Sequence, residues 1–179
     1  MNKYILIGIP SCGKTTLGKR AADILQLPFY DTDRMACEKM GDFHPFEMIK
    51  MSFKERFYRE QKNAVEELYG IDGAAIIATG AEVALIRGCD WYLRSMGIII
   101  HIKRSPEIIL ANMPNNEKSH LILKNVDDGS EINLQKESII GYAKAMSHYD
   151  MLADIIMEND GSEDEGIEKL LAIIRGELC

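Results

Sequence analysis

One run near the amino terminus has the residue types and spacing of a phosphate-binding loop. Gly8 and Gly13, with Lys14 and Thr15 directly after them, complete the pattern G-x-x-x-x-G-K-[S/T]. The glycines let successive backbone N–H groups turn toward phosphate oxygens. The lysine supplies a mobile charge for the β- and γ-phosphates of a nucleotide, and the threonine hydroxyl can ligate Mg²⁺. The other residues expected at this site are Pro10, Ser11, Cys12 and Thr16.

Two carboxylates lie at the end of the second apolar run of the chain. Asp31 and Asp33 could both project from the carboxyl edge of a sheet, where an acidic group is needed to hold the metal. A helix N-cap is an alternative role for Asp33, and it is compatible with a function. Arg56 and Arg59 stand one turn apart in a later helical pattern, so one of them could face the same cleft. The alternative for each arginine is a solvated helix charge.

Short apolar runs alternate with helical patterns along the chain, which predicts an α/β fold with a mostly parallel sheet. The runs are continuously apolar, as is typical of strands covered on both faces. The predicted strands are Tyr4–Ile9, Phe29–Thr32, Ala74–Thr79, Gly97–Lys103 and Ala153–Glu158. The predicted helices lie near 14–26, 53–69, 105–112, 132–148 and 163–175.

Two stretches interrupt this alternation, roughly 33–52 and 112–131. Insertions between the strands and helices of such a sheet lie at its ligand-binding edge, so both stretches are candidates for elements that cover a substrate. An ordinary surface loop is the alternative for the second stretch. His101 lies inside the fourth apolar run, and we predict a strand residue near the sheet end there, not a metal ligand.

The bulk composition restricts the class of protein. A chain of 179 residues with 46% hydrophobic content fits a single domain over 1–179. The net charge of −7, with no basic face, makes nucleic acid an unlikely partner. The apolar start is too short for a signal peptide or a membrane span, so we expect a cytoplasmic monomer without a membrane partner. Scattered cysteines indicate a reducing cytosol and no zinc site: Cys12, Cys37, Cys89 and Cys179.

Over nearly its full length the chain resembles the shikimate kinases. The resemblance is carried by several elements in order, of which only the phosphate loop occurs widely in other proteins. After that loop they are Asp31-Thr32-Asp33 behind Leu-Pro-Phe-Tyr, Phe57-x-Arg59-Glu60, Ala78-Thr79-Gly80 and the approach from Tyr149 to Asp154.

The resemblance implies a three-layer α/β/α P-loop kinase fold with a five-stranded parallel sheet. It implies a helical substrate-binding region at 33–60 and a lid at 112–131. It also implies ATP and Mg²⁺ as cofactors, and a small hydroxylated substrate, shikimate, phosphorylated on its 3-hydroxyl.

The same resemblance implies a role for each matching residue. Lys14 and Thr15 would serve ATP and Mg²⁺, and Asp31 would assist the metal. Asp33 would hold the substrate hydroxyls and orient the reacting proton, and Arg59 would contact the substrate carboxylate. The implied catalytic residues are Lys14, Asp33 and Arg59, and the implied substrate-binding residues are Asp33, Phe57, Arg59, Gly80, Ala81 and Glu82.

The chain departs from the family pattern at five positions. Ala81 and Glu82 stand where the last two glycines of a triplet that lies against shikimate are expected. Ser119 and Ala145 stand where a lid arginine and a second carboxylate-binding arginine are expected. Asn112 replaces an arginine on the adenine side. The nearest cations to the two lost arginines of the lid and the carboxylate site are Lys118 and Lys144.

These departures make the acceptor pocket less favourable for a carboxylate and leave alternatives open. The protein could phosphorylate a neutral polyol or an amine, or Glu82 could point away while Lys118 and Lys144 reach in. Another P-loop kinase of the superfamily, with gluconate or a nucleoside monophosphate as acceptor, is a second alternative. The third is a nucleotide-dependent regulatory module with weakened catalysis.

Overall fold

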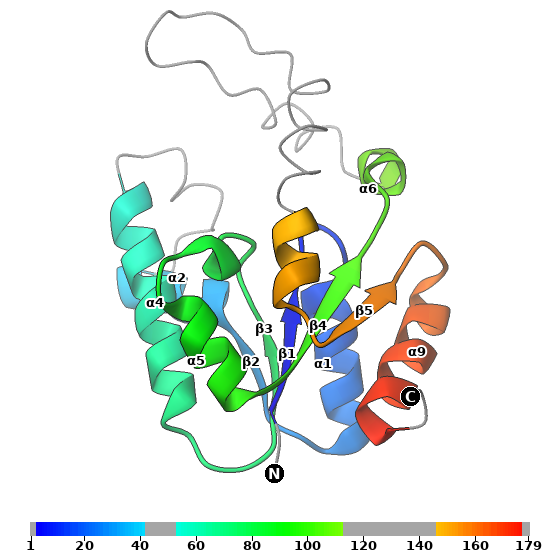
Figure 1. Cartoon of the computed structure of the whole chain (residues 1–179), viewed down its shortest axis with the longest axis horizontal. Helices are drawn as coiled ribbons and strands as arrows, with labels where there is room; N and C mark the ends of the chain where they lie inside the picture. Colours follow the sequence, from blue (N-terminus) through cyan, green and yellow to red (C-terminus); the bar gives the residue numbers. More distant parts are fainter. Residues whose placement is uncertain (1–2, 42–52, 113–145, 177–179) are drawn as a thin grey trace, which may run out of the picture.

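A five-stranded parallel sheet forms the centre of the protein. The computed structural model describes residues 3–41, 53–112 and 146–176. The strands follow one another across the sheet in the order β2-β3-β1-β4-β5, and every neighbouring pair is parallel (Figure 1). They are β1 (Lys3–Ile7), β2 (Phe29–Asp31), β3 (Ile76–Ala78), β4 (Gly97–Lys103) and β5 (Ile155–Glu158).

The central place of β1 follows from its side chains. Ile5, Leu6 and Ile7 are fully buried, as a strand covered on both faces requires. Ile7 is in register with His101 of β4, so the carboxyl ends of these two strands lie side by side. His101 is fully buried within β4, which confirms the prediction of a strand residue there.

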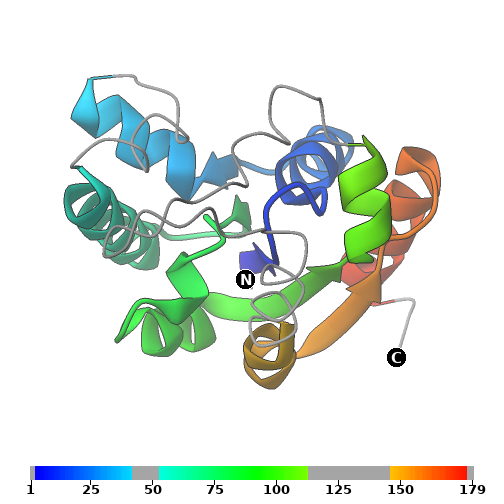
Figure 2. The same ribbon diagram turned by 90° about the horizontal axis from the view of Figure 1, so that it is seen from above.

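Helices cover both faces of the sheet, which confirms the three-layer architecture. Figure 2 shows one face covered by α1 and α9, and the other by α5 and the helical residues 146–152. A further helix, α2, packs along α4. The bounds are α1 (Lys14–Leu25), α2 (Thr32–Met40), α4 (Lys54–Tyr69), η1 (Val83–Leu85), α5 (Cys89–Met96), α6 (Pro106–Asn112) and α9 (Glu163–Arg175).

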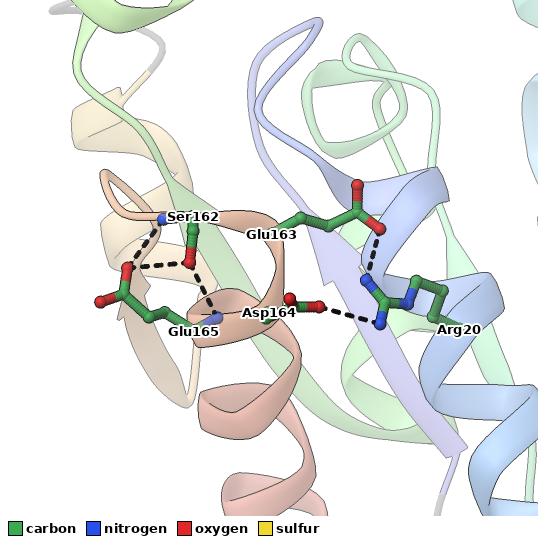
Figure 3. Close-up of polar contacts among 5 residues, drawn as sticks. All are labelled: Arg20, Ser162, Glu163, Asp164 and Glu165. Carbon is green, nitrogen blue, oxygen red and sulfur yellow. Dashed lines mark hydrogen bonds and ion pairs between the residues drawn. The ribbon is translucent and has the colours of Figure 1, made fainter.

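Two ion pairs join the first and last helices. Arg20 of α1 contacts Glu163 at 2.6 Å and Asp164 at 3.0 Å, both in the first turn of α9 (Figure 3). Ser162 and Glu165 form a reciprocal capping box at the start of α9, which satisfies two backbone N–H groups that the helix itself leaves unpaired. These contacts fix the start of α9 against α1.

Two helices lie where the hydrophobic pattern predicted none, although α2 stands at the start of the helical substrate-binding region that the resemblance implied at 33–60. The helix α2 occupies the first part of the predicted insertion at 33–52, and α5 is an eight-residue helix between Gly88 and Gly97. Residues 42–52 and 113–145 lie outside the described part of the chain, and with them most of the predicted lid and of the predicted helix at 132–148. Within the described residues, no helix has the length and apolar character needed to cross a membrane.

Candidate active site

The predicted phosphate loop follows β1 and opens α1. Three of its residues have positive φ angles, namely Gly8 at 146°, Ser11 at 60° and Gly13 at 108°. This curled backbone is the conformation that turns successive N–H groups toward one anion. The ammonium group of Lys14 donates hydrogen bonds to the carbonyl oxygens of Gly8 and Ile9, both at 2.9 Å. The lysine is therefore held over the loop, ready to exchange these carbonyls for phosphate oxygens.

The loop is supported from the far end of the chain. Asn159, directly after β5, donates from Nδ2 to the carbonyl oxygen of Cys12 at 2.8 Å and is only 4% exposed. On the other side, a Cβ atom on Gly8 would lie 2.6 Å from the carbonyl oxygen of Ile102, so only glycine fits there. Asn159 was not predicted as a site residue.

A cavity of about 720 Å³ opens beside the loop. Ser11, Gly13, Lys14, Thr15 and Thr16 line one side of it, and their contact with a nucleotide stays a prediction. The other lining residues are Leu17, Arg104, Ile108 and Asn159–Glu163. Its size falls in the range of cavities that hold ligands as large as a nucleotide.

Three of the predicted cofactor-binding residues do not line this cavity, namely Gly8, Pro10 and Cys12. Cys12 is fully buried, and its Sγ accepts a hydrogen bond from Lys14 Nζ at 3.8 Å. Pro10 is exposed at the tip of the loop. All three therefore shape the loop from outside the cavity, and contact of any of them with a nucleotide stays a prediction.

The two predicted metal ligands are brought together. The hydroxyl of Thr15 donates to Asp31 Oδ2 at 2.8 Å. Mg²⁺ binds through one or two protein oxygens together with phosphate oxygens, so an alcohol and a carboxylate at the edge of a phosphate loop fit it. The other oxygen, Asp31 Oδ1, accepts from the backbone N–H groups of Asp33 and Arg34. The N-cap of α2 is therefore Asp31, and the alternative that Asp33 caps a helix is wrong.

Asp33 lies in the first turn of α2 and accepts a hydrogen bond from the side-chain amide of Gln61. The pKa of Asp33 is raised from 3.8 to about 6, mainly by burial and then by the negative charge of Asp31. The hydrogen bond from Gln61 and the charge of Lys14 act in the opposite direction, and Glu82 adds to the increase. The charges of Lys14 and of Glu82, in the segment after β3, therefore both act on Asp33.

The segment after β3 closes against Asp33. The backbone N–H of Gly80 donates to Thr32 Oγ1 at 2.8 Å. A Cβ atom on Gly80 would lie 2.2 Å from Asp33 Oδ1, so this close approach needs glycine. The hydroxyl of Tyr149 donates to the carbonyl oxygen of Ala81 at 2.6 Å. Glu82 is partly buried next in the chain, close enough for its charge to raise the pKa of Asp33.

Two predicted substrate-binding residues lie on α4 with different exposures. Phe57 is 1% exposed and packs with Ala36 and Cys37, so it holds α2 against α4. Gln61, one turn later on the same face, is fully buried and reaches Asp33. Arg59 is exposed, as is Arg56, and the structure does not bring it to Asp33.

The family model for shikimate kinase matches residues 10–175 of this chain. The chain belongs to the shikimate kinase family. A shikimate kinase of Clostridium botulinum (strain Alaska E43 / Type E3) is 32% identical over 177 residues, which cover 97% of each chain. Another, of Caldanaerobacter subterraneus subsp. tengcongensis, is 34% identical over 122 residues, which cover 68% of this chain and 70% of that relative.

Solved shikimate kinases share the fold of this family member. The enzyme of Acinetobacter baumannii in complex with shikimate superposes with a TM-score of 0.81 at 20% identity, covering 99% of this chain and 94% of that one. The enzyme of Aquifex aeolicus gives a TM-score of 0.75 at 19% identity, with coverages of 98% and 97%. The predicted fold and family are confirmed, and family membership makes the protein an ATP-dependent kinase that acts on an alcohol.

The departures from the family pattern fall partly within the described structure. Ala81 lies in the segment after β3, Glu82 is close to Asp33, and Asn112 ends α6. The remaining positions lie outside the described residues: Lys118, Ser119, Lys144 and Ala145.

Proposed function

We propose that this protein transfers the γ-phosphoryl group of Mg-ATP to the 3-hydroxyl of shikimate. The observation that carries the proposal is the position of Asp33. Its carboxyl group lies within the electrostatic influence of Lys14 on the donor side and of Glu82 on the acceptor side. A carboxylate between a phosphate loop and the segment after β3 is placed to orient a hydroxyl toward a bound phosphate.

Lys14 and the start of α1 act on the donor. The ammonium group and the backbone N–H groups of the loop stabilise negative charge on the transferring phosphoryl group, where charge neutralisation and positioning supply most of the catalysis. Mg²⁺, held through Thr15 and Asp31, would neutralise charge on the phosphate oxygens. The bond from the γ-phosphorus to the bridging oxygen breaks, and ADP leaves with the electron pair.

Asp33 acts on the acceptor. The substrate oxygen forms the new bond to phosphorus while its proton passes to the Asp33 carboxylate. A pKa of about 6 leaves this group mostly ionised at neutral pH, yet more basic than an ordinary aspartate. The hydrogen bond from Gln61 fixes the direction of one carboxylate oxygen, so the other is free to meet the hydroxyl.

A neutral or cationic acceptor is the second candidate, and Glu82 is the observation that favours it. A carboxylate beside Asp33 disfavours a carboxylate on the substrate by like-charge repulsion. Replacing Glu82 with glutamine separates the two candidates. If shikimate is the acceptor, removing this charge lowers the KM for shikimate; a neutral acceptor, such as a polyol, responds little to the same change.

ADP release, measured with the purified protein, ATP and Mg²⁺ as shikimate is varied, tests the proposal. Turnover that depends on shikimate, with a phosphorus signal on the 3-oxygen of the product, supports it. Lys14→Ala should reduce this turnover by about 10²–10³-fold, since a cation at a phosphoryl transition state contributes several kcal/mol. ADP binding without any acceptor-dependent ADP release contradicts the proposal and favours a regulatory role.

We also propose that the protein acts as a monomer in the cytoplasm. One chain supplies both the donor loop and the acceptor carboxylate, so no second copy is needed to complete the site. The cysteines within the described residues, Cys12, Cys37 and Cys89, are buried thiols that form no disulfide, which is compatible with a reducing compartment.

A further inference from the structure

Arg104 directly follows β4, at the sheet edge that also carries the phosphate loop. Its side chain lines the nucleotide cavity. Its Nε atom is buried, and it has no hydrogen-bond partner among the described residues. A buried guanidinium N–H that lacks an acceptor is unfavourable. The side chain as a whole is only half-buried and lines the cavity, so a ligand there can approach the guanidinium group.

The preceding residue, Lys103, is a cation at the same strand end that is paired by carboxylates of the protein. Lys103 forms ion pairs with Asp150 at 3.4 Å and with Glu158 at 3.8 Å. Arg104, one residue later, is directed instead to the cavity. The two consecutive cations therefore have different surroundings, and only the first is paired by carboxylates in the described part of the chain.

The acidic residues of the cavity wall are already engaged elsewhere. Asp160 accepts a hydrogen bond from the backbone N–H of Ser105 at 2.7 Å. Glu163 is paired with Arg20 at 2.6 Å, as Figure 3 shows. Within the described residues neither carboxylate forms an ion pair with Arg104, so its guanidinium group remains available to an incoming anion.

We propose that Arg104 binds phosphate oxygens of the nucleotide, as a second cation in the cavity that Lys14 also lines. Arginine presents N–H groups in a planar fork that matches two phosphate oxygens. The apolar side chain of Ile108, one turn further along, is better suited to the flat face of a base. Arg104 would then supply positive charge to a donor site that has asparagine, Asn112, at the adenine-side arginine position.

This inference rests on the proposed function only in taking a nucleotide as the ligand. Calorimetric titration of the full chain with Mg-ADP tests it without any acceptor. Arg104→Ala should weaken ADP binding by about 10- to 100-fold, the range for a hydrogen bond to a charged group. Arg104→Lys should recover part of this loss. Arg87→Ala removes an exposed arginine that does not line the cavity, and it should leave ADP affinity unchanged.

Inorganic tripolyphosphate distinguishes a phosphate contact from a base contact. If Arg104 binds phosphates, Arg104→Ala should weaken the binding of tripolyphosphate, measured by its competition with ADP. The factor should be about the same as the factor by which the substitution weakens the binding of ADP. Tripolyphosphate that binds both proteins equally, while ADP binds the variant more weakly, overturns the inference in favour of a base contact. Unchanged ADP affinity with a lower melting temperature overturns it in favour of a structural role. If Arg104→Ala weakens the binding of both ADP and tripolyphosphate but the parent protein does not phosphorylate shikimate, only the proposed acceptor is refuted.

Discussion

Replacing Asp33 with asparagine should remove the pH dependence of turnover below neutrality and, at the same time, stabilise the folded protein. Both effects have one cause. Burial, with the charges of Asp31 and Glu82, raises the pKa of Asp33 from 3.8 to about 6. The ionised carboxylate is useful as a base, but it is unfavourable for the folded state.

The size of the stability effect follows from the raised pKa of Asp33. In the unfolded chain this carboxyl group titrates near its ordinary value, so the folded state binds the proton more tightly. Stability is then highest below pH about 4 and is lost as pH rises toward about 6. The asparagine variant stays neutral throughout. It should therefore exceed the parent in unfolding free energy by about 3 kcal/mol at pH 7.5, and by about 1 kcal/mol at pH 4.5.

The rate effect follows from the fraction of Asp33 that is ionised. With a pKa of about 6, roughly 90% of the carboxyl group is ionised at pH 7 and roughly 10% at pH 5. ADP release should therefore fall about tenfold between these pH values, when both substrates are far below saturation and Mg²⁺ is saturating. Asp33→Asn should be at least about 10²-fold slower at pH 7 and nearly independent of pH.

Glu82→Gln is the matched control for this experiment. It removes a charge that raises the pKa of Asp33, so the midpoint of the rate profile should move to lower pH while the tenfold decline per pH unit below it remains. Urea unfolding at pH 4.5 and 7.5 measures the stability differences. A parent midpoint near 4, or an Asp33→Asn protein that is less stable than the parent at pH 7.5, would refute the reasoning.

Three further substitutions test other contacts. Asp31→Ala removes the partner of the Thr15 hydroxyl and the N-cap of α2. A Mg²⁺ titration of activity should show that the variant needs a severalfold higher Mg²⁺ concentration. Urea unfolding should show that the unfolding free energy falls by about 1 kcal/mol. Gly18→Ala places a Cβ atom 2.8 Å from Phe29, so calorimetry should show destabilisation by about 1–3 kcal/mol. Tyr149→Phe removes the hydrogen bond from the hydroxyl to the carbonyl oxygen of Ala81. Urea unfolding should show that the unfolding free energy falls by about 1 kcal/mol, while the affinity for ADP stays unchanged.

The parts of the fold that depend on local pattern were predicted well from the sequence. The strand predicted at Gly97–Lys103 is β4, residue for residue, because a continuously apolar run specifies a buried strand by itself. The helix α5 has only eight residues, and its place depends on burying Leu93 in the core, so its own sequence gave too short a pattern to predict it. The start of α2 was anticipated only through the alternative role of Asp33 as an N-cap, and the structure places the cap two residues earlier, at Asp31.

The residues of the candidate active site also fall into two groups, those that a local motif predicts and those that only the folded chain brings to the site. Lys14, Thr15 and Asp31 were predicted from a motif and a strand end, and the structure brings them together. Gln61 and Asn159 were missed because each acquires its role from a distant contact; the Asn159–Cys12 bond spans 147 residues of sequence. A usable signal existed for Asn159, because it is a polar residue directly after a predicted strand, and Arg104 follows the fourth strand in the same way. The role of Arg59 stays a prediction.

The bond between Asn159 and the phosphate loop also has a consequence for the order in which the protein is made. The loop leaves the ribosome well before the side chain that supports it, because Asn159 follows Cys12 by 147 residues. Asn159 is itself held in place by its backbone N–H, which donates to Lys103 at 2.7 Å, so the last strand must add to the sheet first. A nascent or truncated chain that lacks β5 therefore carries the complete motif without its support. Tight nucleotide binding should then report that β5 has been synthesised and has joined the sheet.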